Sequence, residues 1–127
     1  MMNRFFEKNG NIFYFVFRVI VGVLFLLHGI QKLPGIFDGS TSVVSLMFLA
    51  ALIETIGGIL LIIGLFTRTV ALISAVEMLV AYFMVHMPGG INPLQNKGEL
   101  ALLFFAAFLV LLAFGAKKWG IDSGRGH

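Results

Sequence analysis

Three ionisable residues lie inside otherwise apolar stretches, and they are the first candidates for chemistry. Arg18, Glu54 and Glu77 each interrupt a long hydrophobic run. A charge near the middle of a membrane costs about 2.5–3.5 kcal/mol on insertion scales, so such residues are usually paired or functional. Counting ~1.5 Å per helical residue places the three at comparable depth. We expect a buried charge layer in which Arg18 bridges the two carboxylates, either locking the helices together or carrying protons.

A second polar set lies near the opposite end of the same runs. His28 and His86 are expected there, with Lys32 and Glu99 close by. The simplest interpretation makes them interfacial, hydrogen-bonded residues. Alternatively, His28, Lys32, His86 and Glu99 bind an organic head group such as a quinone, with His28, His86 and Glu99 as candidate catalytic residues, because imidazole moves protons at neutral pH. Haem or a metal bound by the two histidines is less favoured, and we predict no metal site.

His86 can join such a site only if the helix geometry changes before it. Nine positions separate it from Glu77, which is about half a turn out of phase at ~3.6 residues per turn. The residue that precedes a proline is disfavoured in the helical conformation. We therefore expect the helix to loosen before Pro88, which would turn His86 toward the interior.

Four apolar runs must position these residues. A membrane span needs ~20 mostly apolar residues, and the runs cover roughly 12–33, 44–66, 70–87 and 98–116. Pro34-Gly35 and Asp38-Gly39-Ser40 should break the chain after the first run, and residues 122–127 should fray. Since short connections favour antiparallel neighbours, we expect an all-α integral membrane protein with a single domain over residues 1–127. Its architecture would be an up-down-up-down bundle of four transmembrane helices.

The composition supports this class and excludes others. Hydrophobic residues make up 59% of the 127 residues, and the mean hydropathy is +1.00. A soluble domain of this size could not bury so much apolar surface. The chain has no cysteine, which excludes thiolate metal sites and disulfide exchange. Nucleic acid is not an expected partner, because the basic residues lie between the apolar runs and not along one face.

The basic residues predict the orientation in the membrane. Most of them lie at the N-terminus, in the turn at 67–69 and at the C-terminus: Arg4, Lys8, Arg68, Lys117, Lys118 and Arg125. The two other connections hold Lys32 and Lys97. Because loops rich in Lys and Arg stay in the cytoplasm, both termini should be cytoplasmic in a multi-pass protein of the inner cell membrane.

The order of these motifs resembles the DoxX family of small membrane proteins. The resemblance rests on RVIVGVLFLLHGIQKLPG, ETIGGILLIIGLFTRTVAL, the H-x₅-N spacing and NKGELALLFF, and it covers roughly residues 15–122. It implies four transmembrane helices and an oxidoreductase role linked to quinones. The wider superfamily also resembles cargo receptors and receptor-assembly chaperones, which are not enzymes. The resemblance therefore defines the fold more closely than the function.

Three functions are compatible with these observations. The favoured one is a quinone-interacting subunit of a membrane oxidoreductase, in which a partner redox subunit or a bound cofactor supplies the electrons. The second is a non-catalytic membrane protein whose outer loops, 34–43 and 88–97, bind or stabilise a partner. The third is a small-molecule carrier, which would need a homo-oligomer because four helices enclose little space. Whether the chain is itself an enzyme stays undecided at this point.

Overall fold

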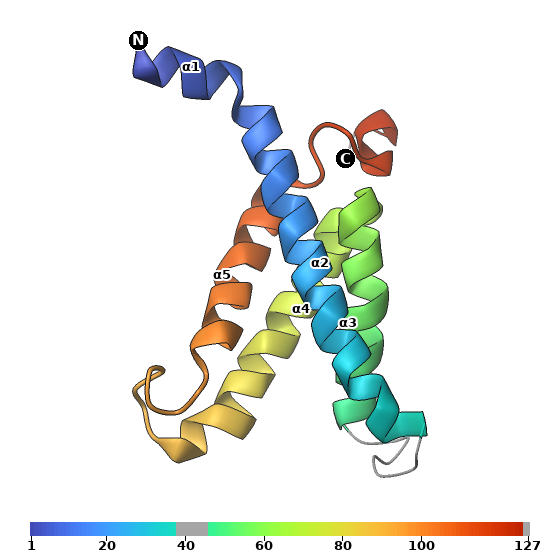
Figure 1. Ribbon diagram of the computed structural model, residues 1–127, viewed down its shortest axis with the longest axis vertical. Coiled ribbons are helices and arrows are strands. Elements are labelled where there is room, and N and C mark those ends of the chain that lie inside the picture. The colour runs from blue at the N-terminus through green and yellow to red at the C-terminus, as the bar shows by residue number, and fades with distance from the viewer. Residues whose placement is uncertain (38–45, 126–127) are drawn as a thin grey trace.

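The computed structural model describes residues 1–37 and 46–125, and every regular element in that part of the chain is a helix (Figure 1). A short helix precedes four longer ones: α1 (Met2–Lys8), α2 (Gly10–Phe37), α3 (Leu46–Ile63), α4 (Thr67–Ala81) and α5 (Glu99–Phe114). Short helical turns complete the fold: η1 (Tyr82–His86), η2 (Met87–Gly89) and η3 (Ile121–Arg125). The expected all-α class is confirmed.

Three helical segments are long and apolar enough to cross a membrane: Gly10–Pro34, Leu46–Ile63 and Thr67–Gly89. The fourth apolar helix, α5, has 16 residues. At ~1.5 Å per residue it is about 24 Å long, which is shorter than the ~30 Å hydrocarbon core of a bilayer. The described helices therefore form a membrane helical bundle.

Two helix ends differ from the sequence-based prediction. Helix α2 continues through Pro34 to Phe37, because proline is tolerated in membrane helices where neighbouring groups satisfy the freed carbonyl. Helix α3 ends at Ile63, earlier than expected, since Gly64 (φ 70°) and Phe66 (φ 53°) adopt left-handed backbone conformations that stop a helix. The predicted break at 38–40 and the first two positions of the predicted second span lie outside the described residues.

The four long helices form two antiparallel hairpins, α2 with α3 and α4 with α5. Figure 1 shows that the hairpins meet near the end that carries both termini and diverge toward the other end. Glycines set the separation of α2 and α3: a Cβ on Gly58 would lie 2.6 Å from the backbone nitrogen of Leu26, and one on Gly22 would lie 2.9 Å from the carbonyl oxygen of Gly58. Small residues of this kind allow membrane helices to approach closely.

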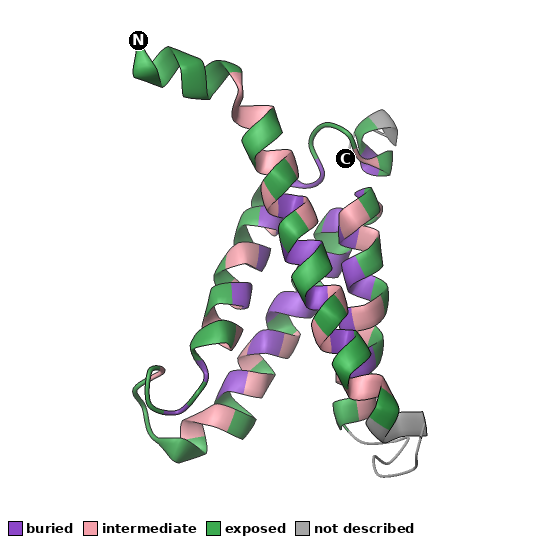
Figure 2. Cartoon of the chain, in the orientation of Figure 1, coloured by how far each residue is buried: buried purple, intermediate pink, exposed green. Residues whose placement is uncertain are grey.

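The buried core lies where the two hairpins meet. Phe25 and Phe108 are almost fully buried, and their rings contact at a centroid distance of 4.8 Å. Figure 2 shows buried residues on the inward helix faces and exposed residues on the outward faces. Many of the exposed side chains are large and apolar, and such an apolar exterior is suited to contact with lipid.

Candidate functional site

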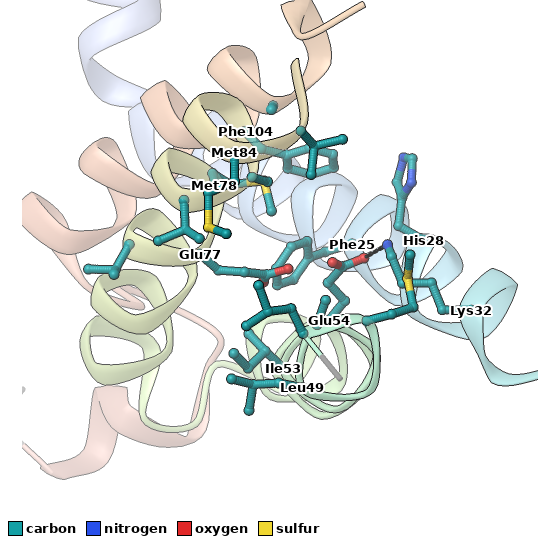
Figure 3. A pocket seen from close by; sticks show the side chains of 18 of the residues that line it. Phe25, His28, Lys32, Leu49, Ile53, Glu54, Glu77, Met78, Met84 and Phe104 are labelled. Carbon is teal, nitrogen blue, oxygen red and sulfur yellow. Dashed lines mark hydrogen bonds and ion pairs between the residues drawn. The ribbon is translucent and has the colours of Figure 1, made fainter. Parts of the chain in front are cut away.

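A cavity of about 830 Å³ lies between the two hairpins where they diverge, and it is referred to below as the cleft (Figure 3). Side chains from α2, α3, α4, η1 and α5 line it, and most of them are apolar. Its volume is typical of sites that bind small organic molecules. The cleft also contains six ionisable side chains: His28, Lys32, Glu54, Glu77, His86 and Lys97.

Lys32 and Glu54 form an ion pair inside the cleft. The Lys32 Nζ lies 2.5 Å from the Glu54 Oε1. Glu54 is buried, and a buried carboxylate is costly unless it is paired and hydrogen-bonded. The sequence-based prediction assigned these two residues to different layers and missed the pair. Gly29 is the sequence feature that could have indicated the pair, because this glycine brings α2 against α3 at Thr55, beside Glu54.

Glu77 extends from α4 toward Glu54 on α3 (Figure 3). Two carboxylates that face each other repel when both are ionised. One oxygen of Glu77, Oε1, is buried and has no hydrogen-bond partner among the described residues. An acceptor of this kind in an apolar cavity is available to a donor on a ligand.

His86 reaches the cleft because the helix widens. The expected loosening before Pro88 takes the form of η1, a single π-helical turn over Tyr82–His86. A π turn has i→i+5 hydrogen bonds, so it rotates the residues after it by about one position, ~100°, relative to a continuous α-helix. The His86 Nδ1 lies 3.2 Å from the carbonyl oxygen of Asn96. Both Glu77 and His86 therefore line the same cavity.

The connection between α4 and α5 holds His86 in place. The Asn96 side chain donates to the carbonyl oxygen of Gly90 (2.9 Å) and to the Tyr82 hydroxyl (3.2 Å), and it accepts from the Gly98 N–H (2.8 Å). Asn96 is buried although it lies in a loop. Its own carbonyl is thereby fixed against the imidazole of His86, which orients the ring.

His28 and Glu99 have different positions relative to the cleft. His28 lines the cleft and packs edge-to-face on Phe104, with ring centroids 5.6 Å apart. Glu99 begins α5, is exposed, and borders a separate surface hollow with Pro93 and Leu103. The structure thus brings together His28, Lys32 and His86 and leaves Glu99 outside. Within residues 1–37 and 46–125, no three His, Asp or Glu side chains are arranged to hold a metal.

Arg18 is fully buried outside the cleft, and it does not bridge Glu54 and Glu77. Its guanidinium donates instead to backbone carbonyls, with the shortest contacts to Ala116 (2.7 Å), Leu61 (2.9 Å) and Trp119 (2.9 Å). The early end of α3 explains the contacts to Leu61 and Ile62, because the last carbonyls of a helix lack intrahelical partners and carry partial negative charge. The other acceptors belong to the segment that follows α5. A planar fork of five N–H donors suits such a ring of acceptors.

Asp122 corrects the expectation of a frayed C-terminal tail. Its carboxylate is buried and accepts from the N–H groups of Phe66 (2.9 Å) and Thr67 (2.8 Å). The carboxylate therefore caps the N-terminus of α4 from more than fifty residues away in the sequence. No local spacing rule predicts a cap supplied from so far along the chain. Residues 126 and 127 lie outside the described residues.

Two further residues complete the end at which the hairpins are joined. The Arg68 guanidinium donates to the carbonyls of Leu112 (3.1 Å) and Ala113 (3.2 Å), near the end of α5. The Tyr14 hydroxyl donates to the carbonyl of Gly115. The four residues Tyr14, Arg18, Arg68 and Asp122 are referred to below as the clamp. The clamp ties α2, α3, α4 and the segment after α5 together at one end of the molecule.

Comparisons with known proteins match most of the chain. The DoxX family model matches residues 13–87. An uncharacterised protein of Haemophilus influenzae is 40% identical, with 92% of this chain and 93% of that protein aligned. A Bacillus subtilis protein named "Putative oxidoreductase CatD" is 32% identical over 95% of this chain and 90% of its own length. An uncharacterised membrane protein of Mycobacterium tuberculosis is 27% identical over 83% of this chain and 76% of its own length. No solved structure matches the chain.

Proposed function

The chain belongs to the DoxX family of membrane proteins, and we propose that its cleft binds the head group of a membrane quinone within an oxidoreductase. One observation carries this proposal: an apolar cavity between two membrane hairpins contains Lys32, Glu54, Glu77 and two histidines. Binding pockets for organic ligands combine apolar walls with a few convergent polar groups. The name of the Bacillus subtilis relative supports the oxidoreductase part of the proposal.

The walls of the cleft suit a ligand that arrives from the bilayer. The sides formed by α3 and α4 include Leu49, Ile73 and Val76, all of which are exposed large apolar side chains. A lipid tail could therefore lie along these side chains while the head group reaches the polar end of the cleft. Such an arrangement removes apolar surface of the ligand from water without closing the cleft to lipid.

Each polar group has a distinct task in this proposal. His28 and His86 bind and orient the head group, and Lys32 keeps Glu54 charged and in place. Glu54 and Glu77 hold a proton next to the ligand, which is where proton exchange during a redox reaction would be needed. A quinone bound here would accept or deliver electrons, and a partner subunit or a second cofactor would exchange them with it.

We further propose that four helices cross the inner cell membrane and that both termini are cytoplasmic. Figure 1 supports this orientation, because the N- and C-termini lie at the same end of the molecule. The clamp residue Arg68 and the cations Lys117 and Lys118 belong to the same end. Concentration of positive charge at one end is the usual mark of the cytoplasmic side.

Direct binding of a short-chain quinone tests the proposal. Purified protein in lipid nanodiscs would be titrated with decylubiquinone and the bound fraction measured by equilibrium dialysis. We expect saturable binding that weakens about 10-fold in His28→Gln or His86→Gln, which corresponds to about 1.4 kcal/mol. Glu99→Gln, outside the cleft, is the matched control and should bind normally. Binding that is absent, or that is unchanged in both histidine variants, would refute the proposal.

One observation favours a second candidate function, the binding of a partner protein. The α4–α5 connection carries two large apolar side chains that are unusually exposed, Ile91 (81%) and Leu94 (74%). Exposed apolar side chains in a short loop are typical of contact surfaces. The other predicted contact loop, 34–43, lies partly outside the described residues. If Ile91→Ser with Leu94→Ser dissociates a complex on native gels and leaves quinone binding intact, the partner function is supported.

A further inference from the structure

The cleft offers hydrogen-bond acceptors that lack donors. The Glu77 Oε1 is buried and unpartnered among the described residues, as noted above. The adjacent Glu54 carboxylate is paired with Lys32, and the Glu77 side chain lines the cleft, so its carboxylate offers an acceptor without a donor at the cleft wall. A buried acceptor without a donor is unfavourable until a ligand supplies one.

His86 adds a second acceptor, and its tautomer follows from its partner. A backbone carbonyl can only accept a hydrogen bond, so the Nδ1 that lies 3.2 Å from the Asn96 oxygen must carry the proton. In the neutral ring, Nε2 then has no proton and presents a lone pair. The buried Asn96 side chain fixes the loop that supplies this carbonyl. The fold therefore selects the acceptor form of His86 before any ligand arrives.

We propose that the cleft selects the hydroxylated, quinol form of its ligand over the quinone form, with the Glu77 carboxylate and the His86 Nε2 accepting the hydroxyl hydrogen bonds. This inference rests on the proposed function and assigns the form of the ligand that the same site prefers. A quinol head group carries two O–H donors, which match the two bare acceptors. A quinone head group carries two carbonyl oxygens, which can only accept.

The hydrogen-bond mismatch of the quinone form determines how strongly the cleft prefers the quinol. A quinone carbonyl placed against the Glu77 carboxylate leaves both facing oxygens without a donor, and a site built to receive a hydroxyl rejects a ligand that lacks it. Lys32 can still donate to a quinone carbonyl, so the quinone is bound more weakly and not excluded. We therefore expect the quinol to bind about 10-fold more tightly or better.

The experiment compares the two redox forms of one compound on the whole protein. Wild-type protein in nanodiscs would be titrated anaerobically with decylubiquinol and, separately, with decylubiquinone. In Glu77→Gln the side chain gains an amide donor at nearly the same size, so it can bind a carbonyl, and the preference should fall to within about 3-fold. Glu99→Gln, the same change outside the cleft, should keep the wild-type preference.

The outcomes separate this inference from the proposed function. A quinol preference that Glu77→Gln removes and Glu99→Gln retains supports the inference. Equal binding of the two forms, tighter binding of the quinone, or a preference that survives Glu77→Gln would overturn it while leaving a quinone-binding cleft in place. Failure of both forms to bind the wild-type protein would overturn the proposed function as well.

Discussion

The Lys32 ammonium on α2 reaches down to the Glu54 carboxylate on α3, at 2.5 Å, and the two ends of this ion pair are buried to different degrees. The Glu54 side chain is 4% exposed, whereas the Lys32 side chain is 25% exposed. Lysine can lie along an apolar surface with its methylene stem and place its charge at a chosen depth. Lys32 therefore neutralises a buried carboxylate while its own side chain stays partly exposed.

Removing Lys32 alone should destabilise the protein. In Lys32→Met the Glu54 carboxylate stays buried without its cation, and breaking a buried pair costs about 3–5 kcal/mol. We expect a large drop in melting temperature in detergent, measured by circular dichroism. The double variant Lys32→Met with Glu54→Gln should recover most of the loss, because no unpaired charge remains. A single variant that melts like the wild type would show that the ion pair does not stabilise the fold.

Arg18 should be essential for folding, and this requirement should not depend on the carboxylates of Glu54 and Glu77. Arg18→Leu removes the guanidinium donor from carbonyls at the end of α3 and in the segment after α5, and each buried group left unsatisfied costs about 1–3 kcal/mol. We expect little monodisperse protein after size-exclusion chromatography, and only partial recovery with Arg18→Lys, which lacks the planar fork. Adding Glu77→Gln to Arg18→Leu should restore nothing. Recovery in that double variant would instead support a direct Arg18–carboxylate layer.

Asp122 should contribute as a remote helix cap. Loss of an N-cap side chain costs about 0.5–2 kcal/mol, and here two N–H groups lose their acceptor at once. Asp122→Ala should therefore lower the melting temperature, and Asp122→Asn should lower it less because one oxygen remains. Glu7→Ala, in the exposed helix α1, serves as the control for removing a carboxylate. Equal melting of Asp122→Ala and Glu7→Ala would contradict the capping role.

The role of the π turn can be tested by a one-residue deletion, because a deletion changes the phase of the helix and a point substitution does not. Deletion of Phe83, an exposed residue within η1, should convert the turn to α-helix and rotate His86 out of the cleft. The variant should still fold, because the connection before α5 can absorb a shift of one residue. We expect decylubiquinone binding to weaken as much as in His86→Gln. A deletion variant that binds normally would show that the position of His86 does not depend on the turn.

The crossing by α5 can be tested with single cysteines, because the native chain has none. With four crossings, Asn3→Cys and Ser123→Cys should both be protected from a membrane-impermeant maleimide in intact cells. Leu94→Cys, in the α4–α5 connection, should be labelled. Each position is exposed, so the reagent can reach it on the accessible side. Labelling of Ser123→Cys with protection of Asn3→Cys would mean that α5 does not cross.

The apolar runs predict the helices well, and the identity of their contacts much less well. Runs of this length and hydropathy have few alternatives to membrane helices, and the phase of His86 against Glu77 correctly demands a change in helix geometry. The partner of Arg18 could not be predicted in this way. It depends on the end of α3, and an error of three residues there shifts the depth estimate by about 4.5 Å.

The Lys32–Glu54 pair and the Asp122 cap escaped prediction for a related reason. Both depend on how elements that are distant in the sequence approach each other, and hydropathy reports only how each element relates to its solvent. Gly29 allowed the approach at Lys32, but a glycine in a membrane helix has many other uses. The remote cap has no local signature, because the helix that Asp122 caps begins at Thr67.

The clamp also has a mechanical consequence for the opposite end of the molecule. Among the described residues, the clamp hydrogen bonds fasten the hairpins at one end, so each hairpin can act as a lever, and ~20 residues of helix beyond the clamp make an arm about 30 Å long. A rotation of only about 5° at the fastened end moves the tip of such an arm by ~2.5 Å, which is most of the contact thickness of an aromatic ring, ~3.5 Å. The width of the cleft can thus change with little rearrangement of the packed core. The clamp hydrogen bonds near one membrane surface therefore influence a site near the opposite surface.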